Sequence, residues 1–79
     1  MDLYEFISKF AEQFDETDSS EFKADTAFKK LVDWSSMVAL SIIAMVDEEY
    51  GVTIQGDDIR KSQTIENLFE IVKDYKSKD

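Results

Sequence analysis

Residues 33–51 read DWSSMVALSIIAMVDEEYG and predict a long, unusually apolar helix. The ten positions before its closing acidic run hold a single polar residue, Ser41. Serine is a favoured N-cap, so the helix is expected to begin at Ser35 or Ser36. It is expected to end before Gly51, because glycine readily takes the left-handed conformation that closes a helix.

This helix is apolar on two opposite sides at about 100° per residue. The side expected to face the core holds Ala39, Ile42, Ile43, Val46 and Tyr50. The opposite side, which we call the outer face, holds Met37, Leu40, Ser41, Ala44 and Glu48, with Asp47 beside it. A short chain has few other elements to cover both sides, so we expect the outer face to meet solvent or a partner. Its apolar centre and acidic edge are typical of protein interfaces. The alternative is that other helices wrap further around it.

Two amphipathic helices are predicted on either side of this segment. The first spans Asp2, a suitable N-cap, to about residue 14, and its apolar stripe consists of Leu3, Phe6, Ile7, Phe10, Ala11 and Phe14. The last begins after Thr64, and its stripe consists of Ile65, Leu68, Phe69, Val72 and Tyr75.

The connections between these helices are expected to be partly ordered. Residues 15–33 form a connection longer than usual, so Phe22, Phe28 and Leu31 are expected to pin it to the core, with a short helix within residues 26–32. Near residue 57 there is room for one helical turn, between the inward anchors Ile54 and Ile59. The sequence thus predicts an all-α fold: one domain over residues 1–79, a small antiparallel bundle of three main helices plus one short helix, with a long first loop.

The composition argues against catalysis. The 79 residues include no cysteine, no histidine, no proline and two glycines. Most hydrolase chemistry and structural zinc sites are thereby excluded. The consecutive acids at residues 47–49 point in different directions around a helix and cannot form an acid–base pair. Asp57 and Asp58 lack the alternating ligands of a calcium loop, and two glycines cannot build a phosphate cradle. We expect a protein that is not an enzyme, with no catalytic residue and no metal site.

Charge and hydropathy bear on whether the protein binds nucleic acid and where in the cell it is expected. Eighteen acids against nine bases give a net charge of −9, so we expect no binding to nucleic acid. No apolar run approaches the roughly 20 residues that span a bilayer, and no leader segment is recognisable, so we expect a cytoplasmic protein.

No base lies between Lys30 and Arg60, and this third of the chain is predicted to form an anionic patch of Asp33, Asp47, Glu48, Glu49, Asp57 and Asp58. Such a patch either solubilises the surface or steers basic partners.

Two serines in succession at a helix start permit a division of roles. Ser35 can cap the helix amides while Ser36, at the first helical position, points its hydroxyl outward. The positively polarised helix terminus would favour a phosphoester on that hydroxyl by about 0.3 to 1 kcal/mol. The alternative is that both serines only cap the helix.

The stretch SMVALSIIAMVDEEYGVTI, residues 36–54, resembles the second helix of acyl carrier proteins. In that family a modified serine is followed by Leu or Met and, fourteen residues later, by an aromatic residue; Ser36 and Tyr50 keep this interval. The likeness continues through Asp57, Asp58, Thr64 and Ile65, and weakly backward through Phe28, so it covers most of the chain.

The resemblance implies that Ser36 receives 4'-phosphopantetheine from coenzyme A through a separate magnesium-dependent phosphopantetheinyl transferase. The thiol of this arm would carry acyl or aminoacyl groups as thioesters, of fatty acid, polyketide or amino acid type. Expected partners are the transferase and acyl-transferring, condensing or ligase enzymes with basic docking patches, and the carrier itself is expected to be a monomer. The residues expected to dock partners are Met37, Leu40, Ser41, Ala44, Asp47 and Glu48. Those expected to line a site for the acyl chain are Ala39, Ile42, Ile43, Val46, Phe69 and Val72, which would equally suit an ordinary core.

The sequence departs from the family pattern around the serine. The common motif is Asp-Ser-Leu, whereas Ser35 precedes Ser36 here and the acid lies further upstream, at Asp33. Val38 and Ser41 stand where the family has acids early in the helix. These departures favour a carrier dedicated to one pathway over the general carrier of fatty acid synthesis. Trp34 would either cover the base of the arm or plug the end of the bundle.

Two alternative functions stay open. An unmodified module with a carrier-like fold could use the apolar outer face for protein interaction or scaffolding, with the serines acting only as caps. A small acidic inhibitor or nucleic-acid mimic would rest on charge alone.

Overall fold

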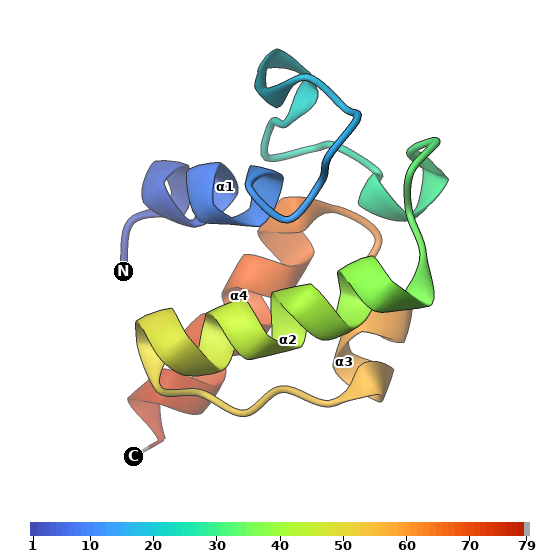
Figure 1. Cartoon of the computed structure of the whole chain (residues 1–79). Coiled ribbons are helices and arrows are strands. Elements are labelled where there is room, and N and C mark those ends of the chain that lie inside the picture. The colour runs from blue at the N-terminus through green and yellow to red at the C-terminus, as the bar shows by residue number, and fades with distance from the viewer. Residues whose placement is uncertain (79) are drawn as a thin grey trace.

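Four helices and two short 3-10 turns make up the structure, a computed structural model that describes residues 1–78 (Figure 1). The helices are α1 (Leu3–Ala11), α2 (Ser36–Tyr50), α3 (Gly56–Lys61) and α4 (Ile65–Ser77). The 3-10 turns, Ser19–Glu21 and Phe28–Lys30, lie in the long connection between α1 and α2. The expected all-α fold of three main helices and one short helix is therefore confirmed.

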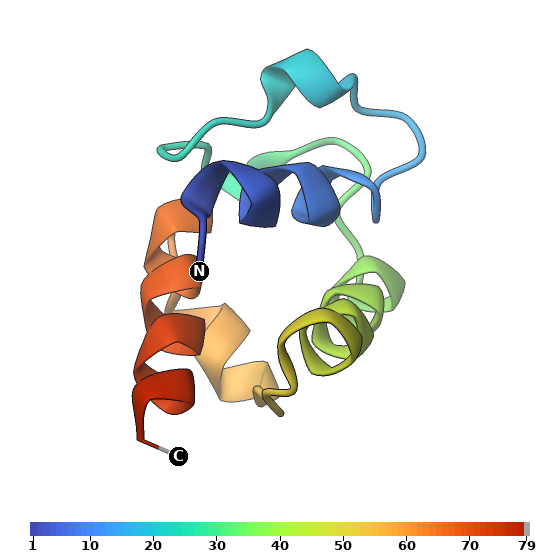
Figure 2. The same ribbon diagram turned by 90° about the vertical axis from the view of Figure 1, so that its left-hand side faces the viewer.

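The three main helices surround one core. In Figure 1, α1 and α2 run in opposite directions and α4 crosses behind α2. Figure 2 shows α1 above, α2 and α4 on either side, and α3 closing the lower side. Contacts join α1 to both α2 and α4, and α3 to α4. The side chains with no exposed surface are those of Phe6, Phe10, Phe28, Ile42, Val46, Ile65, Leu68 and Val72.

Helix α1 is shorter than its apolar stripe. Asp2 caps it as predicted, accepting a hydrogen bond from the Tyr4 amide at 3.1 Å. The helix ends at residue 11, although the stripe predicted continuation to Phe14. The last turn tightens instead, because the Phe14 amide donates to the carbonyl of Ala11, three residues back, at 3.1 Å. Phe14 nevertheless stays buried.

Helix α2 has the predicted ends but a rotated buried side. Gly51 closes it with φ of 68°, and its amide donates to the Asp47 carbonyl at 3.0 Å. Met45 is buried, although the predicted core side omitted it, whereas Ala39 and Ile43 are only half-buried. The reason is tertiary: α1 packs on one flank of α2, so the buried stripe turns toward that flank.

The first loop is pinned at the predicted places. Phe22 and Phe28 are buried and Leu31 is half-buried. The carbonyls of residues 26 and 24 accept hydrogen bonds from the amides of Ile65 and Glu66, at 3.2 and 3.0 Å. The loop thus satisfies amides at the start of α4 that have no partner within the helix.

The C-terminal half is held by a buried carboxylate. Asp58 is 3% exposed and accepts hydrogen bonds from the Gln55 amide at 2.8 Å and the Tyr75 hydroxyl at 2.9 Å. Tyr75, predicted on the inward stripe of α4, is 37% exposed, because its hydroxyl reaches Asp58 at the rim of the core. Ile54 and Ile59 are buried as expected, on either side of the helical turn predicted near residue 57. Thr64 caps α4 through the Asn67 amide at 3.1 Å.

No helix within residues 1–78 combines the length and the apolar character that crossing a membrane requires.

Candidate functional site

The two serines at the start of α2 divide their roles. Ser35 has an extended backbone, and its Oγ accepts a hydrogen bond from the Val38 amide at 3.2 Å, so Ser35 is the N-cap. Ser36 is the first residue of the helix and its side chain is exposed. Its hydroxyl takes part in no hydrogen bond with any other residue of the described range. Ser36 therefore presents a hydroxyl to solvent without a role in capping.

The helix terminus around Ser36 is positively polarised. The Val38 amide is bonded to the cap, and the Ala39 amide donates to the Ser35 carbonyl at 3.0 Å. The first turn contains no acidic residue. A phosphoester on the Ser36 hydroxyl would therefore lie against the positive end of a helix 15 residues long.

Asp33 fixes the chain just before this terminus. Its carboxylate accepts hydrogen bonds from the amides of Glu16 and Thr17, at 3.0 and 3.2 Å, and from the Thr17 hydroxyl. The Thr17 hydrogen bond is the main cause that lowers the pKa of the Asp33 carboxyl below its ordinary value. Asp33 therefore ties the loop after α1 to the segment that leads into α2.

Trp34 packs against the aromatic end of the core. Its ring lies 6.2 Å from that of Phe14 in a stacked arrangement and 5.2 Å from that of Phe28, edge to face. The side chain is half-buried. Of the two roles that the sequence left open, these contacts support that of a plug at the end of the bundle.

The outer face of α2 is exposed. Met37 and Leu40 are 77% and 65% exposed, and Val32, just before the helix, is 92% exposed. All six predicted docking residues reach solvent: Met37, Leu40, Ser41, Ala44, Asp47 and Glu48. The expected exposure of this face is confirmed, although Ser41, Ala44 and Glu48 also border a groove beside α1.

Of the six acids predicted to form an anionic patch, four are paired, hydrogen-bonded or buried. Glu49 forms an ion pair with Lys9 at 3.0 Å, and this contact is the main cause that raises the pKa of Lys9. Asp33 is engaged by the loop, Asp57 pairs with Arg60 and Asp58 is buried. Asp47 and Glu48 are left exposed, with no ion pair inside residues 1–78. Residues distant in sequence engage Glu49 and Asp33, whereas Arg60 lies only three residues after Asp57. The predicted patch is therefore reduced mainly to Asp47 and Glu48.

Two neighbouring grooves flank α2 on the side of α1. The first, which we call the loop groove, has a volume of about 300 Å³ and is lined by Gln13, Asp15, Glu16, Asp33, Ser35, Met37, Val38 and Ser41. The second, the helix groove, also encloses about 300 Å³ and is lined by Lys9, Glu12, Gln13, Ser41, Ala44, Met45, Glu48 and Glu49. Gln13 and Ser41 line both. The loop groove thus begins at the immediate neighbours of Ser36.

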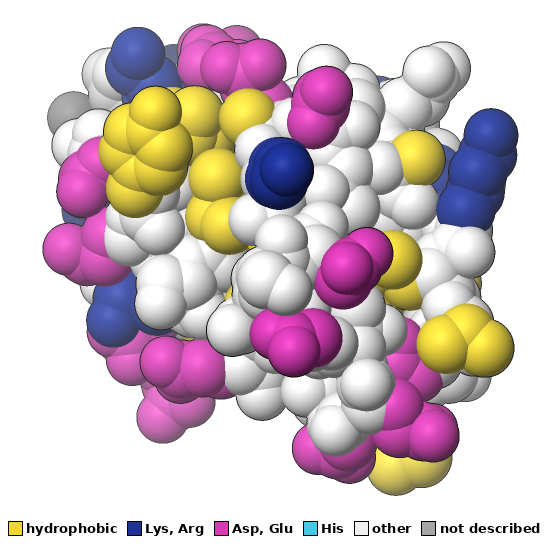
Figure 3. Space-filling view, turned by 90° about the horizontal axis from the view of Figure 1, so that it is seen from above, with side chains coloured by type: hydrophobic (Ala, Val, Ile, Leu, Met, Phe, Trp, Pro, Cys, Tyr) yellow, Lys and Arg dark blue, Asp and Glu magenta, His cyan; other side chains and the backbone are white. Residues whose placement is uncertain are grey.

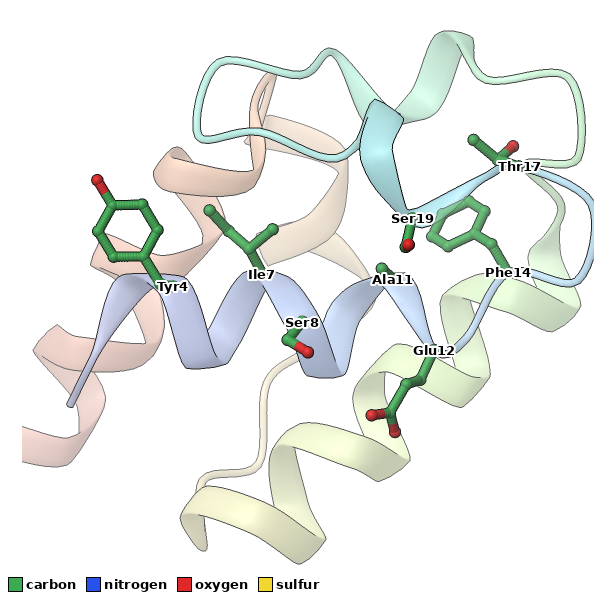
Figure 4. Close-up of a pocket in the computed structure, with 8 residues that line it drawn as sticks. All are labelled: Tyr4, Ile7, Ser8, Ala11, Glu12, Phe14, Thr17 and Ser19. Atoms are coloured by element: carbon green, nitrogen blue, oxygen red, sulfur yellow. The ribbon is translucent and has the colours of Figure 1, made fainter.

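A larger hollow of about 440 Å³ lies on the opposite side of α1 (Figure 4). Helix α1 contributes Tyr4, Ile7, Ser8 and Ala11, and the chain after it adds Glu12, Phe14, Thr17 and Ser19. No residue of α2 lines this hollow, so it stands apart from Ser36.

The residues expected to line an acyl-chain site belong to the packed core. Ile42, Val46 and Val72 have no exposed surface and Phe69 is 5% exposed, while Ala39 and Ile43 are half-buried. None of the six lines either groove or the hollow beside α1.

The structure adds residues that sequence reasoning missed. Asp15, Glu16 and Gln13 reach the neighbourhood of Ser36 through the loop groove. The loop has no apolar periodicity that would fix its path. No local signal fixed it either, because the Asp33–Thr17 contact that holds the loop joins residues 16 apart.

Comparisons of the chain with protein-family models, with curated proteins and with solved structures found no match. The resemblance to acyl carrier proteins therefore rests on the sequence motif.

Proposed function

We propose that this protein is a carrier that holds acyl or aminoacyl groups as thioesters on a 4'-phosphopantetheine arm attached to Ser36. The observation that carries the proposal is the division of roles at the start of α2. Ser35 satisfies the cap, which leaves the Ser36 hydroxyl exposed at a helix terminus that favours a phosphoester.

The residues around Ser36 fit this group. The phosphate would be held by the positively polarised start of α2, where no acidic side chain of the first turn opposes it. The arm, when attached, supplies the thiol that bears the cargo, and the chain has no cysteine to supply one of its own. The remaining residues position this tether and catalyse nothing.

The outer face of α2 supports a role in presenting the cargo to enzymes. Met37 and Leu40 offer exposed apolar surface within two turns of Ser36, and Asp47 and Glu48 provide an acidic edge further along. Basic docking patches on transferases, condensing enzymes or ligases would complement this surface. Because such attraction is electrostatic, association should slow as salt rises.

Attachment can be tested by mass. The protein is incubated with coenzyme A, Mg²⁺ and each of several phosphopantetheinyl transferases, and intact mass is measured. We expect one arm on the wild type and on Ser35→Ala, and none on Ser36→Ala. A wild type that no transferase modifies, or a modified Ser36→Ala, would contradict the proposal.

Unfolding measurements on the same variants separate capping from attachment. Ser35→Ala should lose about 1 kcal/mol of stability, because the Val38 amide loses its acceptor. Ser36→Ala should lose almost none, since its hydroxyl bonds to nothing in the described chain. Tight binding of a protein to the outer face, unaffected by Ser36→Ala and without any attachment, would favour the scaffolding alternative.

A further inference from the structure

The end of α2 that carries Ser36 has no acidic residue of its own. Val38 and Ser41 occupy its first two turns, and the acids of the outer face begin at Asp47. At about 1.5 Å per residue, Asp47 lies about 16 Å along the helix from Ser36. Contacts to Asp47 and Glu48 alone would therefore leave an approaching enzyme without electrostatic guidance at the reacting hydroxyl.

The first loop supplies negative charge at this place. Asp15 and Glu16 are exposed and line the loop groove together with Ser35 and Met37, the two neighbours of Ser36. Neither acid forms an ion pair within residues 1–78. Asp33 holds them there, because it accepts hydrogen bonds from the amides of Glu16 and Thr17 and from the Thr17 hydroxyl.

The same groove contains an exposed apolar side chain and no base among its lining residues. Met37 is 77% exposed and lines the groove. No base occurs between Lys30 and Arg60. Helix α2 begins on the right in Figure 1, and the lower right part of Figure 3 shows acidic and hydrophobic side chains with no lysine or arginine among them.

We propose that the loop groove is the docking site for a basic segment of the phosphopantetheinyl transferase, with Asp15 and Glu16 as its anionic contacts and Met37 as its apolar contact. This inference rests on the proposed function. The transferase must touch Ser36 and must also bind coenzyme A, whose phosphates require positive charge near the site of transfer. Lysine or arginine side chains at the edge of such a site complement the two loop acids.

The test compares two pairs of charge-neutralising substitutions. One variant carries Asp15→Asn and Glu16→Gln; the control carries Asp74→Asn and Glu70→Gln on α4, which changes net charge equally on exposed positions. kcat/KM for arm transfer is measured by mass at low and high salt with a transferase that modifies the wild type. We expect a loss of about tenfold in the loop variant at low salt, mainly in KM, and less than about twofold in the control. The difference should shrink at high salt.

A further variant tests the positioning by Asp33. Thr17→Val keeps both loop acids but removes the Thr17 hydroxyl that bonds Asp33. It should also raise KM while far-UV circular dichroism stays unchanged. If the wild type is loaded and the loop variant matches the control, the docking inference is overturned while the carrier function stands. If no transferase loads the wild type, the carrier proposal fails first.

Discussion

Removal of one buried oxygen atom should make this protein more stable. The Tyr50 side chain is 9% exposed, and its hydroxyl is buried without a hydrogen-bond partner anywhere in residues 1–78. The ring packs against Phe6 at 5.8 Å between centroids. Burial raises the pKa of the phenol, and nearby Glu5 adds to the rise. Tyr50→Phe would keep the ring contacts and delete the polar atom alone.

The magnitude follows from the cost of an unpaired buried donor, about 1–3 kcal/mol. Allowing for partial relaxation around the hydroxyl, we expect Tyr50→Phe to raise the free energy of unfolding by about 1 kcal/mol. For a domain of this size, that corresponds to a rise in Tm of about 4–8 °C.

The chain offers a matched control that loses the same atom. The Tyr75 hydroxyl donates to the Asp58 carboxylate at 2.9 Å. Tyr75→Phe should lower the free energy of unfolding by about 1 kcal/mol, since Asp58 loses a partner at the rim of the core. The two variants should therefore differ by about 2 kcal/mol with opposite signs relative to the wild type.

Urea unfolding followed by far-UV circular dichroism provides the assay. The m-values of all three proteins should agree, so that midpoints compare directly. A Tyr50→Phe protein that is destabilised as much as Tyr75→Phe would refute the reasoning. It would show that the Tyr50 hydroxyl has a partner, such as an ordered internal water.

Three further predictions concern the backbone, the loop and the core. Gly51→Ala should lower the free energy of unfolding by about 1 kcal/mol in thermal or urea unfolding, because φ of 68° disfavours a side chain even though no atom lies near its Cβ. Gly56→Ala is the control: Gly56 lies in equally open space without positive φ, so this change should be neutral or slightly stabilising. Asp33→Asn should be less stable than the wild type at neutral pH. The folded-state pKa of Asp33 is lowered, so its contribution to the free energy of unfolding is complete above the ordinary pKa of about 3.9. This contribution disappears as pH falls through the folded-state pKa. A difference in stability between Asp33→Asn and the wild type that persists below that pH would contradict the link to Thr17. Phe28→Ala should lower the free energy of unfolding by about 3–5 kcal/mol, since this fully buried ring contacts Phe10 and Trp34. A loss below about 1 kcal/mol in urea unfolding would show that the loop is not part of the core.

The helices, the start of each main helix and the end of α2 could be predicted from the sequence because the signals are local, whereas the end of α1 could not. Gly51 and Thr64 act within one helical turn, and the apolar spacing of α1 and α4 is read along a single segment. The exposed outer face of α2 was also predictable, since a chain of 79 residues has too few elements to cover it. The candidate attachment residue, Ser36, belongs to this group, because its position depends only on the preceding cap.

The direction of burial and the partners of charged groups depended on tertiary structure. Met45 is buried because α1 packs on its side of α2, and Tyr75 turns to the rim to reach Asp58. The helical period defines two sides of α2 but not which flank a neighbour will cover.

Local sequence signals were enough to predict three main helices and one short helix, the N-caps of the main helices and an exposed serine at the start of α2. The placement of Asp15 and Glu16 in one groove with Ser35 and Met37, the two neighbours of this serine, depends on hydrogen bonds of Asp33 that span 16 and 17 residues. The two kinds of feature differ in the sequence separation of their contacts, because a cap or an apolar stripe is satisfied within a few residues of itself. The place of a loop acid is fixed only when the chain folds back on the helix that it faces.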